Sequence, residues 1–245
     1  VTGAVGGIGS VICRTLAQAG ARLVLVDRKP EADIQVFADT LPGQGHLAAQ
    51  AAIDDSAQLR RLAERVADRF GAVDVLVNNA GITRPVAHDD LDGLDDELID
   101  SIFRINWRGS FACIRAFRPL LEGGDGGVVV NISSIAGTTA VGSNVAYCAS
   151  KAAINSMTLA LARALAPRVR VVAVAPGWVM GEYAKRMDPA YIKQQEDLTP
   201  LGRPRPSTEV IAPRASPASH VRPVSSFTSR SAAWSSSAPR SSFPL

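Results

Sequence analysis

Apolar residues along this chain follow two patterns in turn: short aliphatic runs and longer stretches with helical spacing. The aliphatic runs are typical of buried strands and occur at residues 23–26, 75–77 and 171–175. The helical pattern covers Gly9–Ala19, Ser56–Phe70, Asp95–Leu121 and Ala146–Ala166. Strands that alternate with helices of this length favour a parallel sheet with helices on both faces. We therefore expect a three-layer, doubly wound α/β fold.

The composition changes near residue 203. Residues 201–245 hold twelve Ser, seven Pro and six Arg, with almost no apolar periodicity after Glu209–Ala212. Such a segment cannot bury enough apolar surface to offset the entropy of ordering it. We expect one domain over residues 1–203. The remainder, 204–245, is predicted to be a disordered tail or the product of a shift of reading frame after about Ala212.

The net charge of +3 on 245 residues has its source in the same tail. Residues 201–245 contain six Arg and one Glu, so residues 1–200 carry a net charge of −2. The net negative charge of residues 1–200 therefore predicts no nucleic-acid partner. No apolar run is long enough to span a membrane. Three scattered cysteines predict a reducing cytoplasm, and three histidines without metal-ligand spacing predict no metal site.

Tyr147 and Lys151 lie four residues apart in a predicted helix, so they share one face of it. A free tyrosine has a pKa of about 10 and is a poor base near neutrality. Lowering that pKa by roughly three units takes about 4 kcal/mol, which a lysine beside it in a partly dry site can supply. The pair would then donate and accept protons at ordinary pH. Taken alone, most such pairs are ordinary neighbours on a helix surface.

A glycine-rich turn, Thr2-Gly3-Ala4-Val5-Gly6-Gly7-Ile8-Gly9, leads into the first predicted helix. Glycines let the backbone approach a pyrophosphate closely, and a helix N-terminus behind them favours an anion. Asp27 ends the strand that follows, where an acidic side chain would hold a ribose 2′-hydroxyl. The alternative is a plain turn with a surface aspartate, but strand, spacing and acid together favour a dinucleotide site.

These motifs, with Asn78-Asn79-Ala80-Gly81 and Tyr147-x-x-x-Lys151, resemble those of the short-chain dehydrogenase/reductase family. The resemblance runs from Val1 to about Arg203, with the motifs in order and at the right separations. It implies a Rossmann-type sheet, a nicotinamide cofactor and hydride exchange between a secondary alcohol and a ketone. Reductases of 3-oxoacyl thioesters are among the bacterial members that the chain resembles.

The family's catalytic residues match Asn106, Ser134, Tyr147 and Lys151 in this sequence. The resemblance implies that Tyr147 is the general acid/base and that Lys151 lowers its pKa and holds the nicotinamide ribose. It implies that Ser134 hydrogen-bonds the reacting oxygen and that Asn106 supports a water chain. Plainer alternatives exist, because Ser134 could merely end a strand and Asn106 could satisfy backbone groups inside a helix. Ser133 is expected to point to the other side of its extended segment.

The resemblance also implies which residues contact the cofactor. They are Gly3, Gly7, Ile8, Gly9, Asp27, Ile53, Asn79, Ala80, Gly81, Tyr147, Lys151, Pro176, Gly177 and Val179. Asp27 favours NAD over NADP, because a carboxylate accepts from a 2′-hydroxyl and repels a 2′-phosphate. Arg28 follows it and could instead reach a phosphate.

Two positions depart from the family pattern. Ala52 stands where an aspartate often meets the adenine, and Asp54 and Asp55 could replace that contact or only cap the next helix. Gly181 stands where a threonine usually contacts the cofactor.

The two ends depart further. A first strand in the middle of the sheet and a final helix and strand are expected but not visible. Losing about four buried aliphatic side chains of that strand would cost roughly 6–12 kcal/mol, which is close to the stability of a whole domain. The expectation is therefore that the sequence lacks its true start.

The leading interpretation is an NAD-preferring alcohol dehydrogenase or ketoreductase that acts on a small-molecule alcohol or ketone. Its substrate loop would span about 178–202, where Tyr183, Met187, Tyr191 and Ile192 predict a partly apolar pocket, with Arg186 and Lys193 expected to face solvent. The two long central helices could form a homodimer, whereas the family's tetramer contact needs the missing end. The alternatives are a catalytically silent relative and an NAD-binding regulatory protein.

Overall fold

The computed structural model describes residues 1–180, 189–197 and 205–206. The chain divides into two units, Val1–Pro213 and Arg214–Leu245. The second unit, the predicted helix at 209–212 and most of the predicted tail lie outside the described residues. The boundary at 203/204 and the nature of the tail therefore stay predictions.

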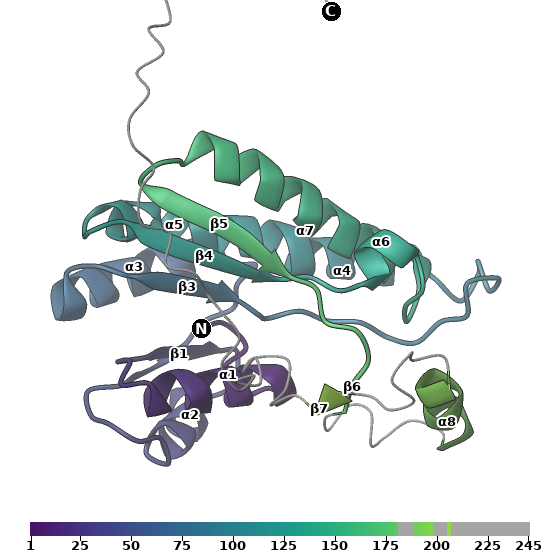
Figure 1. The fold of residues 1–245 in the computed structure, drawn as a ribbon, viewed down its shortest axis with the longest axis horizontal. Helices are drawn as coiled ribbons and strands as arrows, with labels where there is room; N and C mark the ends of the chain where they lie inside the picture. Colours follow the sequence, from purple (N-terminus) through teal and green to yellow (C-terminus); the bar gives the residue numbers. More distant parts are fainter. Residues whose placement is uncertain (181–188, 198–204, 207–245) are drawn as a thin grey trace, which may run out of the picture. The chain divides into compact units, whose positions relative to one another are not determined.

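Strands and helices alternate along the first unit, as the apolar pattern predicts (Figure 1). In chain order they are α1 (Gly7–Gln18), β1 (Val24–Asp27), α2 (Glu31–Ala38), β2 (Leu47–Gln50), α3 (Ser56–Phe70), β3 (Val75–Asn78), α4 (Asp96–Phe103), the π-helical turn η1 (Arg104–Gly109), α5 (Ser110–Glu122), β4 (Gly127–Ile132), α6 (Ala136–Thr139), α7 (Val145–Ala164), β5 (Val169–Val174), β6 (Val179–Met180), α8 (Pro189–Asp197) and β7 (Arg205–Pro206).

Every strand pair described is parallel. β1 pairs with β2, and β3, β4 and β5 form a second ladder in that order. The first residues of the chain lie between the two ladders. The N–H of Thr2 donates to the Val77 carbonyl at 3.0 Å, and the N–H of Val26 donates to the Val1 carbonyl at 2.9 Å. Residues 1–4 therefore occupy the central position that the sequence analysis assigned to a first strand.

Helices cover both faces of the sheet, which confirms the three-layer, doubly wound prediction. Leu25 belongs to the core formed with α1 and α2, whereas its neighbour Val26 belongs to the core formed with α3, α5 and α7. This alternation follows from the period of two along a strand. In Figure 1, α3, α5 and α7 accordingly gather on one side and α1 and α2 on the other.

The predicted helix Asp95–Leu121 is the element that differs most from its prediction. It is α4, η1 and α5 in succession, because a π-helical turn interrupts the α-helical hydrogen bonding at Arg104–Gly109. Such turns insert an extra residue and often occur at functional sites. Gly109 in this turn packs so closely that a Cβ there would lie 2.7 Å from Cδ1 of Ile53.

The other predicted helices agree more closely with the structure. Ser56–Phe70 is confirmed in full, and the first and last predicted helices are shifted by one or two residues at each end. Asp55 caps α3, accepting from the N–H groups of Ala57 and Gln58 at 2.8 and 3.0 Å. The sequence analysis did not delimit α2, β2 or α6. The β2 sequence, LAAQ, has little β-branched character, so its pattern does not indicate a strand.

Candidate active site

The structure brings Tyr147, Lys151 and Ser134 together beside the carboxyl end of β4. Tyr147 and Lys151 lie on the same face of α7, and the Lys151 Nζ atom is 5.6 Å from the centroid of the Tyr147 ring. Lys151 is buried, and its Nζ donates to the carbonyl of Ile132, the last residue of β4, at 2.8 Å. The shared helix face inferred from the spacing is thus present in the fold.

Burial shifts the proton equilibria of both side chains. It lowers the pKa of Lys151 to about 8, because the charged ammonium loses hydration. It raises the pKa of Tyr147, and a hydrogen bond with the Ser134 side chain opposes part of that shift. The expected lowering of the tyrosine pKa by Lys151 is therefore not what this structure has. Desolvation of the phenol is the larger effect, and Lys151 directs its ammonium toward the Ile132 carbonyl.

Ser133 and Ser134 point to different partners, as predicted. The Ser133 hydroxyl donates to the Lys151 carbonyl at 3.2 Å and to the Asn155 side-chain oxygen at 2.6 Å. The Ser134 hydroxyl lies 3.5 Å from the Pro176 carbonyl, and its oxygen accepts from the Ala136 N–H at 3.2 Å. Ser133 therefore anchors α7 to the strand end, and Ser134 is the serine beside Tyr147.

Asn106 lies in η1 and is completely buried. Its Oδ1 accepts from the Ile82 N–H at 2.8 Å, and its Nδ2 donates to the Ile82 carbonyl at 3.0 Å. Nδ2 also lies 3.1 Å from the Ser150 hydroxyl oxygen, and the Ser150 hydroxyl donates to the Tyr147 carbonyl at 2.8 Å. Asn106 thus connects η1, the segment after β3 and the helix that carries Tyr147. The backbone groups that Asn106 satisfies belong to Ile82, outside any helix, and not to a helix as the alternative supposed.

The glycine turn is closely packed at Gly3 and Gly9 but open at Gly7. Gly3 has a φ of +62°, and a Cβ on Gly9 would overlap the Gly3 carbonyl oxygen and lie 2.7 Å from Asn79 Nδ2. A Cβ on Gly7, by contrast, would meet nothing within 4 Å. Gly6, which has no side chain, is the N-cap residue of α1. The first N–H groups of that helix, including those of Gly7 and Ile8, are therefore placed as an anion site requires.

The Asn-Asn-Ala-Gly segment ties this turn to the sheet. Asn79 Nδ2 donates to the carbonyls of Thr2 and Gly3 at 3.0 and 3.1 Å, and the N–H of Ala80 donates to the Thr2 hydroxyl at 3.1 Å. Asn78 Nδ2 donates to Asn131 Oδ1 at 2.9 Å, directly across β3 and β4. These two asparagines therefore bond into the sheet and to the glycine turn.

Asp27 stands at the end of β1, next to the glycine turn. Its carboxylate accepts from the Val5 N–H at 3.3 Å and from the Lys29 N–H at 3.2 Å. Asp55 is a helix cap, and Asp54 pairs with Arg104 at 3.2 Å, so both acids have structural partners. Ala52 donates its N–H to the Gln58 side chain at 3.0 Å.

The remaining predicted contacts lie on neighbouring segments. Ile53 is buried beside Gly109, and a Cβ on Gly81 would lie 3.1 Å from Asn106 Oδ1 and 3.9 Å from Lys151 Nζ. The Pro176 carbonyl accepts from the Ile135 N–H at 3.0 Å, Gly177 follows it, and Val179 begins β6.

Of the predicted substrate loop, the structure describes residues 178–180 and 189–197. Tyr183, Arg186 and Met187, together with Gly181, lie outside the described residues. The backbone of Tyr191, Ile192 and Lys193 lies in α8.

Sequence reasoning missed three polar residues that hold the site together: Thr2, Asn144 and Ser150. Asn144 is the N-cap of α7, accepting from the Tyr147 N–H at 2.7 Å. An asparagine just before an apolar-periodic stretch is a known helix-start signal, so the sequence could have indicated this cap. Thr2 belongs to the glycine-rich motif, but the local pattern marks neither its bond to Ala80 nor the bond between Ser150 and Asn106, because these partners lie far away along the chain.

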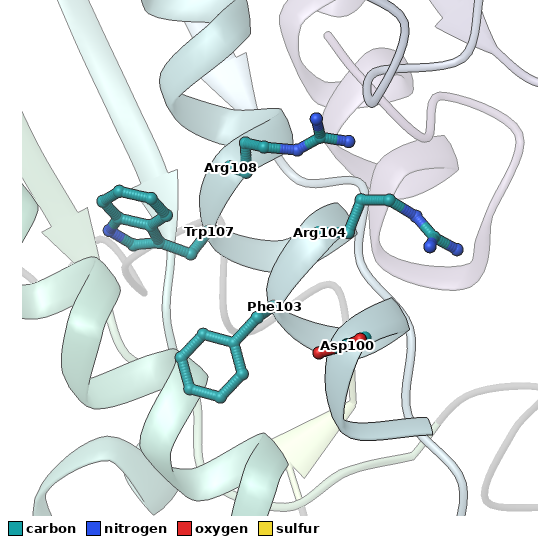
Figure 2. Close-up of a pocket in the computed structure, with 5 residues that line it drawn as sticks. All are labelled: Asp100, Phe103, Arg104, Trp107 and Arg108. Carbon is teal, nitrogen blue, oxygen red and sulfur yellow. The ribbon is translucent and has the colours of Figure 1, made fainter. Parts of the chain in front are cut away.

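A surface hollow of about 430 Å³ lies along α4 and η1, away from Tyr147. In Figure 2 the rings of Phe103 and Trp107 project to one side of these helical turns, and Arg104 and Arg108 project to the other. Among the described residues, no helix combines the length and apolar character needed to cross a bilayer. Nor do the described parts of the chain contain a group of three or more acidic, His or Cys side chains arranged to bind a metal.

Comparison with known proteins agrees with this fold. The short chain dehydrogenase family model matches residues 1–191. A galactitol 2-dehydrogenase (L-tagatose-forming) from Cereibacter sphaeroides is 38% identical over 217 residues, which cover 86% of this chain and 84% of that relative. A 3-oxoacyl-(acyl-carrier-protein) reductase FabG from Staphylococcus aureus is 32% identical over 213 residues, covering 86% and 85%.

A solved structure agrees as well. The short-chain dehydrogenase/reductase SDR:glucose/ribitol dehydrogenase from Brucella melitensis has a TM-score of 0.78 and 30% identity, and the match covers 86% of this chain and 84% of that one. The fold and these relatives indicate an oxidoreductase that uses a nicotinamide cofactor. The chain belongs to the short-chain dehydrogenase family.

Proposed function

We propose that this protein interconverts a secondary alcohol and a ketone with NAD as its preferred cofactor and Tyr147 as its general acid/base. The observation that carries the proposal is the convergence of Ser134, Tyr147 and Lys151 beside the end of β4. The hydrogen bond between the Ser134 and Tyr147 side chains brings two hydroxyl groups together, so one substrate oxygen can contact both. The names of the relatives, a polyol dehydrogenase and an oxoacyl reductase, support this substrate class.

The residues at the glycine turn fit a dinucleotide. The space at Gly7 and the tight packing at Gly9 form a cradle that side chains would fill, and the N-terminus of α1 favours a phosphate there. Asp27, Asn79 to Gly81 and Lys151 follow along the same edge of the sheet, where they would hold the two riboses. When bound, the nicotinamide cofactor supplies or accepts the hydride.

The protein's own residues handle the proton. Because burial raises the pKa of Tyr147, its hydroxyl carries a proton at neutral pH and can give it to a ketone oxygen. Ser134 would stabilise the charge that develops on that oxygen. Lys151, with a pKa of about 8, can carry or release a proton near physiological pH. Asn106 holds the segment after β3 against the helix that carries both residues.

Asp27 supports the preference for NAD. Its carboxylate, held by the Val5 N–H, would accept from a 2′-hydroxyl and repel a 2′-phosphate. No basic residue stands within the glycine turn itself, from Thr2 to Gly9, while Arg28 beside Asp27 is the residue that works against the preference.

We further propose a homodimer formed through α4, η1, α5 and α7, in the cytoplasm. Trp107 supports this contact, because 37% of it is exposed while its ring stacks on Phe111 with the centroids 6.1 Å apart. Leu159 on α7 is also exposed. The three free cysteines are all buried and support a reducing compartment. Sedimentation velocity tests the assembly: a monomer at micromolar concentration would contradict it.

The experiment that tests the function is thermal unfolding of the whole chain with NAD⁺ or NADP⁺, followed by turnover of a panel of ketones and polyols. A cofactor at one hundred times its dissociation constant adds about 2.7 kcal/mol to the free energy of unfolding. Because NAD⁺ is the proposed cofactor, we expect it to raise the melting temperature more than NADP⁺ does. Tyr147→Phe should keep that shift and lose turnover. A shift without turnover in either protein would favour an NAD-binding regulatory protein, and no shift with either cofactor would favour a catalytically silent relative.

A further inference from the structure

A second buried asparagine stands at the start of the helix that carries Tyr147. Asn144 is completely buried, and its Oδ1 caps α7 by accepting from the Tyr147 N–H at 2.7 Å. The helices α3 and α4 are capped differently, by the carboxylates of Asp55 and Asp95. Capping needs only an acceptor. Asn144 differs because its amide also carries a donor.

That donor contacts a distant part of the chain. Asn144 Nδ2 donates to the Arg84 carbonyl at 2.7 Å and lies 3.3 Å from the Thr83 hydroxyl oxygen. Both residues belong to the segment that leaves β3, residues 82–86, which we call the 82–86 strap. Figure 1 shows the chain after β3 running past the α6–α7 end of the fold. One asparagine therefore bonds two segments at once.

The contact between the strap and the start of α7 is reinforced by the residue before Asn144. The Val86 N–H donates to the Ser143 carbonyl at 2.8 Å, and the Thr83 and Ser143 hydroxyl groups are hydrogen-bonded to each other. The strap thus meets residues 143–144 through several hydrogen bonds, and Asn144 is the only described residue among them that also reaches Tyr147.

The other end of the strap is held by Asn106. Its side chain bonds both the N–H and the carbonyl of Ile82, and its Nδ2 also reaches the Ser150 hydroxyl. Ser150 in turn bonds the Tyr147 carbonyl. The strap therefore links two buried asparagines, and the helical turn that bears Tyr147 is held at its N–H by Asn144 and at its carbonyl through Ser150 and Asn106.

We propose that Asn144 is a positioning residue that sets the place of the Tyr147 hydroxyl by locking the first turn of α7 to the 82–86 strap. The inference rests on the proposed function, in which that hydroxyl moves the proton. The first turn of a helix is where fraying begins, because its N–H groups lack intrahelical partners. A reacting group displaced by about 1 Å can lose roughly a hundredfold in rate. A cap that is also tied to a fixed segment prevents such a displacement.

Two variants separate capping from locking. Asn144→Ala removes both contacts. Asn144→Ser keeps a hydroxyl acceptor for the cap but is too short to reach the Arg84 carbonyl as the amide does. Asp55→Ala is the matched control, because it removes a side-chain cap from α3, and the Asp55 carboxylate accepts only from the first turn of that helix.

Turnover and hydrogen exchange are then measured on the whole chain. We expect Asn144→Ser to lower kcat about tenfold or more, with KM for the cofactor unchanged and with an altered pH profile of kcat. Asp55→Ala should turn over like the unaltered protein, even if its melting temperature falls by as much as that of the Asn144 variants. Amide exchange of peptides that cover the strap should accelerate in both Asn144 variants, and exchange at the start of α7 should accelerate only in Asn144→Ala.

Each outcome decides the inference. A kcat for Asn144→Ser equal to that of the unaltered protein overturns it, as does a loss of kcat in Asp55→Ala of the same size. If the unaltered protein turns over no substrate, the proposed function has failed and the exchange data stand alone. Faster exchange of the strap in Asn144→Ser then supports the lock, and unchanged exchange of the strap overturns it.

Discussion

The Lys151 ammonium lies 5.6 Å from the centre of the Tyr147 ring, and it donates to the Ile132 carbonyl rather than to a carboxylate. The contact fixes Lys151 at the end of β4, directly beside the segment that supplies Ser134. A buried ammonium with a neutral acceptor keeps its proton less firmly than an exposed one. The pKa of about 8 expresses that loss of hydration, and it has a measurable consequence for stability.

Lys151→Met should change how stability depends on pH. The folded-state pKa of about 8 lies below the ordinary value of 10.5, so the unfolded chain binds more protons between these two values. The free-energy cost of burying the charged Lys151 ammonium is complete below pH 8, and it disappears as the pH rises from 8 to 10.5. The free energy of unfolding of the unaltered protein, minus that of Lys151→Met, should therefore increase by about 3 kcal/mol between pH 7 and 10.5.

Urea unfolding at a series of pH values measures this difference. Lys29→Met is the control, because the Lys29 side chain is exposed. A difference that stays constant with pH for Lys151→Met, as for the control, would contradict the buried ammonium.

The pH dependence of turnover should differ between the two directions of the reaction. Burial raises the pKa of Tyr147, so the protonated form that donates to a ketone is present at neutral pH. Alcohol oxidation needs the deprotonated form, and its rate should rise with pH, by at most about tenfold per unit. Ketone reduction should not rise. Initial rates in both directions between pH 6 and 9 test this, and an oxidation rate independent of pH would indicate a base other than Tyr147.

Gly9→Ala should disrupt the glycine turn, whereas Gly7→Ala should not. The added Cβ at position 9 overlaps the Gly3 carbonyl oxygen, while at position 7 it meets open space. Backbone rather than a flexible side chain must move at position 9, so a loss of about 2–4 kcal/mol of stability is expected. Gly7→Ala should be neutral or slightly stabilising, because alanine is the better helix former. Thermal melting of the two variants measures the contrast, and equal melting temperatures would show that the turn is not closed as described.

Asp27→Ser should weaken the preference for NADH over NADPH. The carboxylate that repels a 2′-phosphate is removed, so the ratio of kcat/KM for the two cofactors should fall about tenfold or more. Asp39→Ser is the control, because Asp39 is an exposed acid at the end of α2. An unchanged ratio in Asp27→Ser, or an equal change in Asp39→Ser, would assign the preference to another residue.

The sequence carried most of the fold and the identities of the candidate site residues. Aliphatic runs and helical spacing specify the parallel sheet, because burial on two faces demands apolar residues at those periods. The spacing of Tyr147 and Lys151 places them on one helix face whatever the rest of the fold does. The glycine turn and Asp27 can likewise be recognised locally. A tight turn before a helix and an acidic residue at the end of a strand each depend only on neighbouring residues in the sequence.

Only the tertiary structure decided how these parts act on one another. The direction of the Tyr147 pKa shift depends on how far the phenol is desolvated, and the spacing of residues says nothing about that. Asn106, in the π-helical turn, bonds both backbone groups of Ile82, which lies 24 residues away along the chain. Asn144 carries a cap signal in the sequence, but its bond to Arg84 spans 60 residues. Helix periods and turns follow from neighbours along the chain, whereas protonation and positioning depend on partners that only folding brings together.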